Sequence, residues 1–192
     1  MLKGSCCIIR ADGSKRLGLG HFTRSLALAE GLTSSGIVPR FLCREAPDGA
    51  LNWLTHSNYA VETFSANTDF EDDLAYTLEQ IHQLKASWVL TDLCNIDTLE
   101  DIEGYQNYLQ GLKDAGVFVM TVDDLNHFPF PSNLVLNPNY RADELPYEPQ
   151  PGTRYLLGPS FFPFSRELSQ VAGQPRKISN TVSRVLVTLG GG

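Results

Sequence analysis

A histidine and an arginine stand one helical turn apart, directly after a glycine-rich turn. Gly18 and Gly20 precede His21, and Arg24 follows it by three residues. Glycine lets the backbone adopt positive φ and lets a ligand approach closely, and the start of a helix offers free N–H groups to an anionic or hydroxylated ligand. The helix dipole disfavours an imidazolium at this end. We therefore expect His21 to be neutral near pH 7 and able to act as a general base.

Arg24 falls on the same face of the expected helix as His21, where its guanidinium can meet a carboxylate or a phosphate. The alternative is that His21 caps its own helix and Arg24 pairs with a surface acid. The turn is not a dinucleotide-binding fingerprint, because Thr23 occupies the position of the third glycine. The pair therefore indicates a general base beside an anion-binding group, without naming the ligand.

Polar side chains also follow four of the apolar runs that we interpret as strands. In an open parallel sheet, ligands bind beyond the carboxyl ends of the strands, so these residues are candidates for a substrate site. They are Arg10, Asp12 and Ser14 after residues 6–9, Asp92 and Asn95 after residues 88–90, Asp123 and Asp124 after residues 117–122, and Asn137 and Asn139 after residues 134–136. Carboxylates gathered beside His21 would orient its ring, bind sugar hydroxyls or hold a metal.

Each acid also has a simpler interpretation, since Asp12, Asp92 and Asp124 would cap the next helix or turn. Together they favour a site in which His21 is catalytic. The predicted substrate-binding residues are Arg10, Asp12, Ser14, Gly18, Gly20, Arg24, Asp92, Asn95, Asp124 and Asn137. No pair of acids has the spacing of a known metal-ligand motif, so we expect neither a metal nor another cofactor.

The elements that must position these residues follow from hydrophobic periodicity. Strands are predicted at residues 6–9, 37–43, 59–64, 88–90, 117–122, 134–136 and 155–157, and helices at residues 21–32, 50–56, 70–85 and 99–115. Strands that alternate with helices of this length form a parallel sheet with right-handed crossovers. We predict the α/β class, with a doubly wound, Rossmann-like parallel sheet.

The composition of the chain changes after Leu125, where frequent prolines predict a loop-rich segment. Residues 185–189 form one more apolar run, and three glycines follow it without a helix. We interpret residues 1–178 as one Rossmann-like domain. Residues 179–192 are interpreted as the first strand and glycine loop of a second, truncated domain, so that the chain is cut from a longer protein.

Composition excludes several classes of function. The 192-residue chain has a formal net charge of −7 and no local cluster of Lys and Arg, which argues against binding to nucleic acid. Its four cysteines have neither metal-ligand spacing nor the density of a disulfide framework. No apolar run approaches the roughly 20 residues that span a bilayer, and the N-terminus is not a signal peptide. We expect a soluble, cytoplasmic protein whose oligomeric state stays open.

Several motifs together carry a family resemblance. They are Arg10-Ala-Asp-Gly-Ser, Leu17-Gly-Leu-Gly-His-Phe-Thr-Arg, Asp123-Asp-Leu, Leu136-Asn-Pro-Asn-Tyr, Leu156-Leu-Gly-Pro-Ser-Phe and Arg166-Glu. With these motifs the chain resembles the UDP-sugar hydrolases of pseudaminic acid biosynthesis, which are similar to the GT-B glycosyltransferases of peptidoglycan assembly. The resemblance covers most of the chain and implies the N-terminal domain of a GT-B fold.

In that family the N-terminal half binds the sugar, the C-terminal half binds UDP, and a histidine at the position of His21 acts on water without a metal. The resemblance implies a nucleotide-sugar substrate, with hydrolysis that releases UDP from an amino or deoxy sugar. The family commonly has Asp-His-Tyr where this chain has Asp92-Leu93-Cys94, which removes an aromatic side chain near the sugar. Two other functions stay open: a glycosyltransferase in which His21 activates an acceptor hydroxyl, and a sugar-nucleotide-binding module without catalysis.

Overall fold

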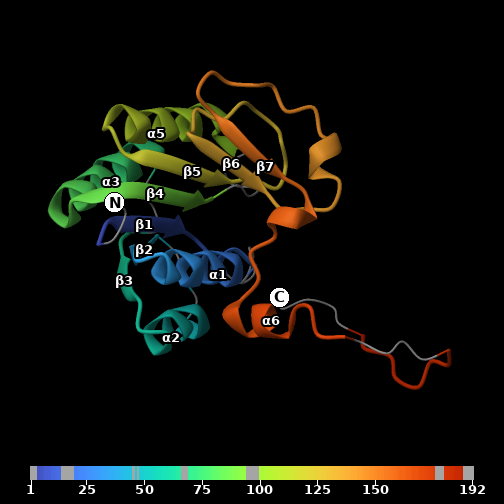
Figure 1. Ribbon diagram of the computed structural model, residues 1–192. Helices are drawn as coiled ribbons and strands as arrows, with labels where there is room; N and C mark the ends of the chain where they lie inside the picture. Colours follow the sequence, from blue (N-terminus) through green and yellow to red (C-terminus); the bar gives the residue numbers. More distant parts are fainter. Residues whose placement is uncertain are drawn as a thin grey trace.

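The computed structural model describes residues 4–13, 20–44, 46, 48–65, 69–93, 100–175 and 180–187 (Figure 1). Among these, one sheet contains β1 (Cys6–Ala11), β2 (Val38–Cys43), β3 (Ala60–Thr63), β4 (Ala86–Asp92), β5 (Phe118–Val122), β6 (Leu134–Asn137) and β7 (Arg154–Leu157). The helices are α1 (Gly20–Ser34), α2 (Asp48–His56), α3 (Phe70–Leu84), α5 (Ile102–Asp114) and α6 (Arg166–Val171). Two short 3-10 helices are η1 (Ala142–Glu144) and η2 (Pro159–Phe161).

The strands lie in the order β3-β2-β1-β4-β5-β6-β7, and every neighbouring pair is parallel. The chain runs outward from β1 through β2 and β3, and then returns to place β4 on the other side of β1. This is the doubly wound, Rossmann-like arrangement, which confirms the predicted fold class. The direction of winding reverses between β1 and β4, and ligands of such sheets bind at that switch point.

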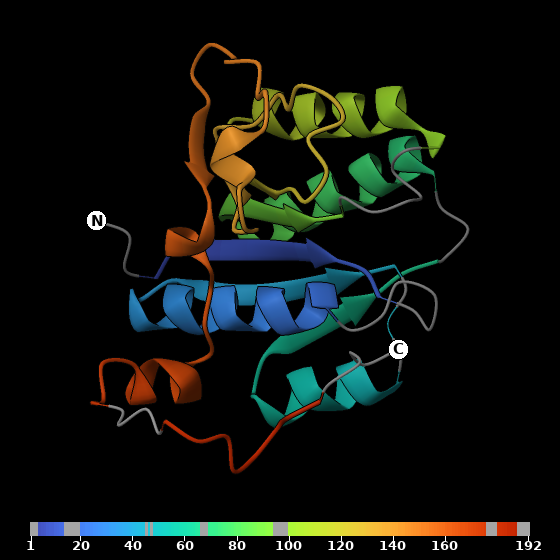
Figure 2. The same ribbon diagram turned by 90° about the vertical axis from the view of Figure 1, so that its right-hand side faces the viewer.

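Helices cover both faces of the sheet (Figures 1 and 2). On one face α3 and α5 pack around a core that includes Phe70, Tyr105 and Tyr108. On the opposite face α1 contributes Phe22 and Ala29 to a second core, which Leu54 of α2 also joins. Because both faces are covered, β1 is buried at every residue, as expected for a central parallel strand. None of the described helices has the length and hydropathy that a bilayer span needs.

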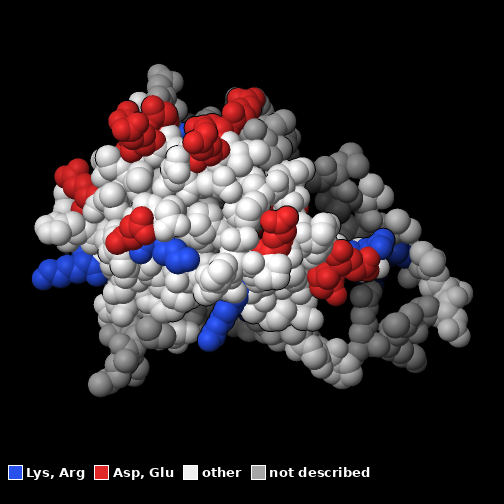
Figure 3. All heavy atoms as spheres, turned by 90° about the horizontal axis from the view of Figure 1, so that it is seen from above, with Lys and Arg blue, Asp and Glu red and all other residues white. Residues whose placement is uncertain are grey.

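Acidic caps fix where two of these helices begin. The carboxylate of Asp69 accepts a hydrogen bond from the backbone N–H of Asp72 at 2.9 Å, and Asp101 caps α5 through the N–H of Gly104 at 2.9 Å. Such caps satisfy N–H groups that the helix itself leaves unpaired. They add to the acidic character of the surface: seen from above, Asp and Glu side chains outnumber Lys and Arg on the part of this face that is described (Figure 3).

The predicted elements match the observed ones closely except at the C-terminal end. Residues 180–187 have no regular secondary structure, and Val185, Leu186 and Val187 are exposed. The described part of the strand predicted at residues 185–189 is therefore not a strand. The physical reason is that a strand needs a neighbour to accept its backbone hydrogen bonds, and residues 180–187 pair with none of the described strands. The division into domains at residue 178 stays a proposal.

A buried ion cluster joins β1 to α3. The guanidinium of Arg10 is fully buried and donates hydrogen bonds to Asp12 at 2.5 Å and to Asp73 at 2.8 Å. It also lies 5.0 Å from the centroid of the Phe64 ring, within range of a cation–π contact. Burial is the largest effect on Asp12 and opposes its charge, but Arg10 and Arg44 together outweigh burial and lower the pKa of this carboxyl. The buried charge of Arg10 is therefore compensated by carboxylates of the chain itself.

We predict that Asp73→Ala lowers the free energy of unfolding by about 3 kcal/mol, because it leaves the buried Nε of Arg10 without its hydrogen-bond partner. Urea denaturation measures the loss. Glu79→Ala is the matched control, since Glu79 is an exposed acid of the same helix and accepts a hydrogen bond from Gln83; we expect its cost to stay below about 1 kcal/mol. Equal losses in the two variants would contradict the structural role of Asp73.

Candidate functional site

His21 and Asp92 meet at the switch point of the sheet. His21 stands in the first turn of α1, and its Nδ1 lies 2.7 Å from Oδ1 of Asp92, the last residue of β4. Asp92 is fully buried, whereas the His21 side chain is 12% exposed. With Nδ1–H donated to the carboxylate, Nε2 is the ring atom left for proton transfer. The sequence-based expectation that a carboxylate orients His21 is thus met by Asp92.

Arg24 joins this pair to the next strand. Its guanidinium donates to Asp92 through Nε at 2.9 Å and Nη2 at 2.6 Å, and to Asp124 through Nη1 at 2.6 Å and Nη2 at 2.9 Å. Both pairs are bidentate, which the planar fork of a guanidinium favours. The alternative that Arg24 pairs with a surface acid fails for Asp92, which has no exposed surface.

Two further side chains complete the group. Ser25 Oγ donates to Asp92 at 3.3 Å, and Asn139 Nδ2 donates to Asp124 at 2.8 Å. The result is a continuous hydrogen-bonded group that runs from the start of α1 across the carboxyl ends of β4, β5 and β6. We call it the His21 network; its members are His21, Arg24, Ser25, Asp92, Asp124 and Asn139.

Opposing effects set the protonation of His21. Burial disfavours the imidazolium and is the largest effect, but the hydrogen bond and the charge of Asp92 together outweigh it and raise the pKa of His21 above 6.5. This direction is opposite to the one expected from the helix dipole, because a full carboxylate charge at 2.7 Å acts more strongly than the partial charge of a helix end. The stabilisation that the pair contributes is complete below the unfolded-state pKa and is lost as pH rises through the folded-state pKa.

Asp92 itself stays ionised. Burial raises its pKa, but the charge of Arg24 and the hydrogen bond from His21 more than offset burial, so the pKa of Asp92 is lowered. An ionised carboxylate on Nδ1 holds the tautomer in which Nε2 accepts a proton, and it stabilises the imidazolium that then forms. The arrangement is chemically that of a general base with an orienting carboxylate.

Arg10 and Asp12, which the sequence suggested as substrate-binding residues, lie outside the His21 network. The physical reason is that β1 continues to Ala11, so that Arg10 lies inside the sheet instead of beyond its end. Arg10 is 0% exposed and both of its carboxylate partners come from the chain itself, which leaves it no surface for a ligand. Asp12 accepts the backbone N–H of Arg44 at 2.7 Å. The structure gives both residues a packing role.

Asn137 and Asp123 are also fully buried and form a second group, which joins the His21 network where the backbone N–H of Asn139 donates to Asn137 Oδ1 at 3.1 Å. Asn137 Nδ2 donates to the hydroxyl of Tyr147 at 2.9 Å, and this hydroxyl donates to Asp123. Asp123 further accepts the backbone N–H of Asn126 at 3.0 Å. The group shapes the turn that carries Asp124, so Asn137 contributes to the candidate site indirectly, by holding this turn in place.

The remaining predicted residues divide into two sets. Gly20 begins α1 beside His21. A Cβ atom added there would meet no atom within 4 Å, so packing against the described residues does not require a glycine at this position. Ser14, Gly18 and Asn95 lie outside the described residues. Within the described part of the chain, no group of three or more His, Cys, Asp or Glu side chains is arranged to hold a metal ion.

Sequence reasoning missed two residues of these groups, Ser25 and Tyr147. Ser25 carried a usable signal, because it follows His21 by four residues and therefore lies on the same face of α1. Tyr147 lies in the proline-rich segment, where no periodic pattern assigns a side chain to a face.

No family model and no curated protein matches the sequence. Among solved structures, MurG of Acinetobacter baumannii matches with a TM-score of 0.52 and 12% identity, over 79% of this chain and 45% of that one. The chain thus spans about half the length of MurG. A Cj0485 dehydrogenase matches with a TM-score of 0.40 and 14% identity over 64% of this chain and 52% of that one. BdcA in complex with NADPH matches with a TM-score of 0.42 and 11% identity, over 68% of this chain and 57% of that one.

The likeness to MurG defines a class of fold. Together with the seven-stranded parallel sheet, it places the chain among Rossmann-like α/β domains that match the N-terminal domain of a GT-B fold. At 12% identity the likeness concerns the fold alone. The matches to the Cj0485 dehydrogenase and to BdcA, with TM-scores of 0.40 and 0.42, carry no argument about this chain.

We predict that Asp92→Asn lowers the pKa of His21, because burial then acts without a neighbouring full negative charge. NMR titration of the four histidine rings measures the change. Asp124→Asn is the matched control, since it also removes a carboxylate partner of Arg24 but contributes the smallest effect on His21. A drop in the control as large as that in Asp92→Asn would contradict the assignment.

Proposed function

We propose that the chain is the sugar-side half of an enzyme that hydrolyses a nucleotide-linked amino or deoxy sugar. The observation that carries this proposal is the His21–Asp92 pair at the switch point of the sheet. His21 Nε2 takes a proton from water, the water oxygen bonds to the anomeric carbon, and the bond from that carbon to the phosphate oxygen breaks. UDP leaves with the electron pair of that bond. The motif resemblance and the GT-B-like fold support the same reading.

The other members of the His21 network fit recognition of a polar sugar. Asp124 is the more open carboxylate, with 26% of its side chain exposed, whereas Asp92 is sealed. An exposed carboxylate accepts the hydroxyl or N–H groups of an amino sugar, and Asn139 beside it offers a mixed donor and acceptor. Arg24 holds Asp124 in place for this contact.

A glycosyltransferase is the second candidate, and the fold likeness to MurG favours it. In that case Nε2 would take its proton from an acceptor hydroxyl instead of water, with the same orienting carboxylate. A binding module without catalysis is the third. All three are compatible with a cytoplasmic location, which we propose because Cys6, Cys7 and Cys43 are free and buried. Burial raises the pKa of Cys7 and of Cys43 to about 12, so these thiols stay protonated.

Release of UDP by the intact protein from UDP-linked amino and deoxy sugars tests the proposal. We expect release into water, and a loss of about 10²- to 10⁴-fold in His21→Gln, because the general base is removed while a polar side chain is kept. His82→Gln, on the exposed face of α3, is the control and should keep full activity.

Each other result assigns a different function. Release that depends on an added acceptor would identify a glycosyltransferase, and tight binding without release would identify the binding module. A loss below about threefold in His21→Gln would exclude His21 as the base.

We also propose that the UDP diphosphate binds mainly outside the described residues. A diphosphate is well held by free N–H groups at a helix start, but those of α3 and α5 are capped by Asp69 and Asp101. The start of α1 faces the sugar side in our proposal. The nucleotide contacts would then come from a C-terminal half, as in the hydrolase family that the motifs resemble.

Calorimetric titration of the 192-residue chain with UDP tests this division. We expect a dissociation constant weaker than about 1 mM, with uridine as the control for contacts to the nucleoside alone. A low micromolar constant, about −8 kcal/mol of binding free energy, would show that this chain carries the nucleotide site itself.

A further inference from the structure

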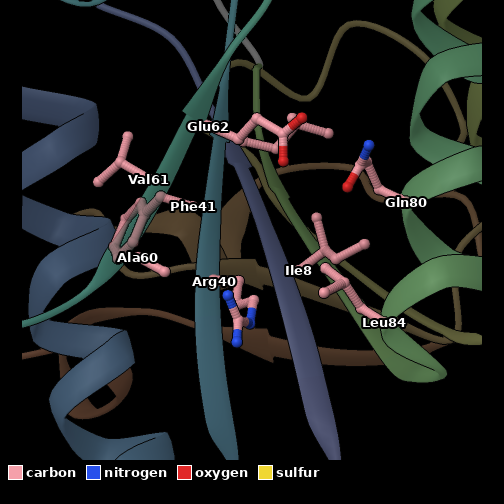
Figure 4. Close-up of a pocket in the computed structure, with 9 residues that line it drawn as sticks. Ile8, Arg40, Phe41, Ala60, Val61, Glu62, Gln80 and Leu84 are labelled. Carbon is pink, nitrogen blue, oxygen red and sulfur yellow. The ribbon is translucent and has the colours of Figure 1, made fainter.

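A pocket lies away from the His21 network, on the α3 face of the sheet. It is a cavity of about 80 Å³ between β2, β3 and α3 (Figure 4). Ile8, Leu42 and Leu84 provide its apolar lining, and Arg40, Glu62 and Gln80 its polar groups. It exists because the outward side chains of β2 and β3 on this face, among them Arg40 and Glu62, are exposed and α3 does not cover them.

Gln80 is the residue that points to a ligand. It is only 6% exposed, yet its amide makes no hydrogen bond with any described residue. No buried polar side-chain atom of the described chain is left both sealed and unpaired, so the amide of Gln80 reaches solvent through the pocket. No group of the described chain therefore holds this amide, and its oxygen and N–H groups are free to bond a molecule that enters the pocket.

The charged groups of the pocket are separated along its length. Figure 4 shows the Glu62 carboxylate and the Gln80 amide facing each other at one end and the Arg40 guanidinium at the other, with Ile8 between the two ends and Leu84 across from Arg40. The Tyr76 hydroxyl donates to Glu62 and holds that carboxylate in place, and the Tyr76 ring stacks on Phe64 with 4.8 Å between centroids.

Strand register sets the spacing of the two charges. Arg40 pairs with Ala60, and Glu62 pairs with Leu42, so Glu62 lies one strand over and two residues further along than Arg40. Strand geometry makes this diagonal about 8 Å between Cα atoms. A ligand that meets both groups therefore needs opposite charges at the two ends of a short chain.

We propose that this pocket binds a short aliphatic ω-amino acid. Its ammonium group has three N–H donors and bonds both the Glu62 carboxylate and the Gln80 amide oxygen. Its carboxylate pairs with the guanidinium of Arg40, which suits a planar carboxylate. Its methylene chain lies on Ile8, Leu42 and Leu84. The site is separate from the His21 network, so such a ligand binds together with the sugar substrate and does not compete with it.

Titration of the 192-residue chain with 5-aminopentanoate, followed by NMR or calorimetry, tests the proposal. We expect saturable binding with a dissociation constant below about 1 mM. Pentylamine lacks the carboxylate and pentanoate lacks the ammonium, and each should bind at least about tenfold more weakly because it leaves one charged group unpaired. Absence of saturable binding by 5-aminopentanoate at about 10 mM, or equal binding of pentylamine, would overturn the proposal.

Two variants assign the binding to the pocket. Glu62→Gln keeps the size of the side chain and should weaken 5-aminopentanoate binding at least about tenfold, because the ammonium loses its counter-charge. Gln80→Leu should abolish binding. Gln83→Leu is the matched control, since Gln83 is an exposed glutamine of the same helix that donates to Glu79, and it should bind as the wild type does.

Thermal unfolding of the same variants separates a ligand-binding glutamine from a structural one. Gln80→Leu should leave the melting temperature unchanged or raise it, because an unpartnered amide is replaced by an apolar side chain beside Leu84. A melting temperature lower than that of Gln83→Leu would show that Gln80 supports the fold, and unchanged binding in Gln80→Leu would show that the ligand binds elsewhere. Either result would overturn the proposal.

Discussion

The guanidinium of Arg24 lies between two carboxylates from different strands, Asp92 at the end of β4 and Asp124 just after β5. Asp92 is fully buried, and a buried carboxylate stays ionised only if cations and hydrogen-bond donors compensate it. Arg24, Ser25 and the ring N–H of His21 supply that compensation, all from the first turns of α1. The same contacts fix where α1 begins relative to β4 and which way the imidazole faces. Orientation of His21, the proposed general base, is thus a consequence of satisfying a buried charge.

Two arginines of this chain solve the same electrostatic problem in different surroundings. Arg10 and Arg24 each bridge two aspartates, but Arg10 and Asp73 are completely sealed, whereas Arg24 and Asp124 keep 13% and 26% of their side chains exposed. A sealed cluster has no group left to offer a ligand, so its contribution is to join β1 to α3. An open cluster retains acceptor positions that substrate hydroxyls can occupy. Exposure, and not residue type, separates the structural cluster from the site.

The sheet was predicted from the sequence because it depends on local patterns, namely apolar runs and helical periodicity. Polar residues after strands likewise pointed to Asp92 and Asp124, which the structure brings to His21 and Arg24. The interpretation of Arg10 as a substrate-binding residue was wrong because the first strand was predicted to end at Ile9, whereas β1 ends at Ala11. A shift of two residues at a strand end decides whether a side chain lies inside the sheet or beyond it. The direction of the His21 pKa shift was wrong for another reason. Which carboxylate reaches His21 depends on β4 lying next to β1, a long-range pairing that no local pattern shows. The unpartnered amide of Gln80 is hidden in the same way, since its surroundings come from β1, β2 and β3.

The net charge of the His21 network also indicates which part of the substrate this network would contact in the proposed reaction. With neutral His21, one guanidinium faces two carboxylates, so the network carries a net charge of −1, which becomes zero once His21 accepts a proton. Such a site attracts no diphosphate and gives little help to a departing phosphate oxygen, which needs positive charge or free N–H groups. It does favour uptake of a proton from the nucleophile, because the reaction neutralises an excess of negative charge. The His21 network therefore suits contacts with the nucleophile and the sugar. In the proposed reaction, groups outside this network have to stabilise the leaving group.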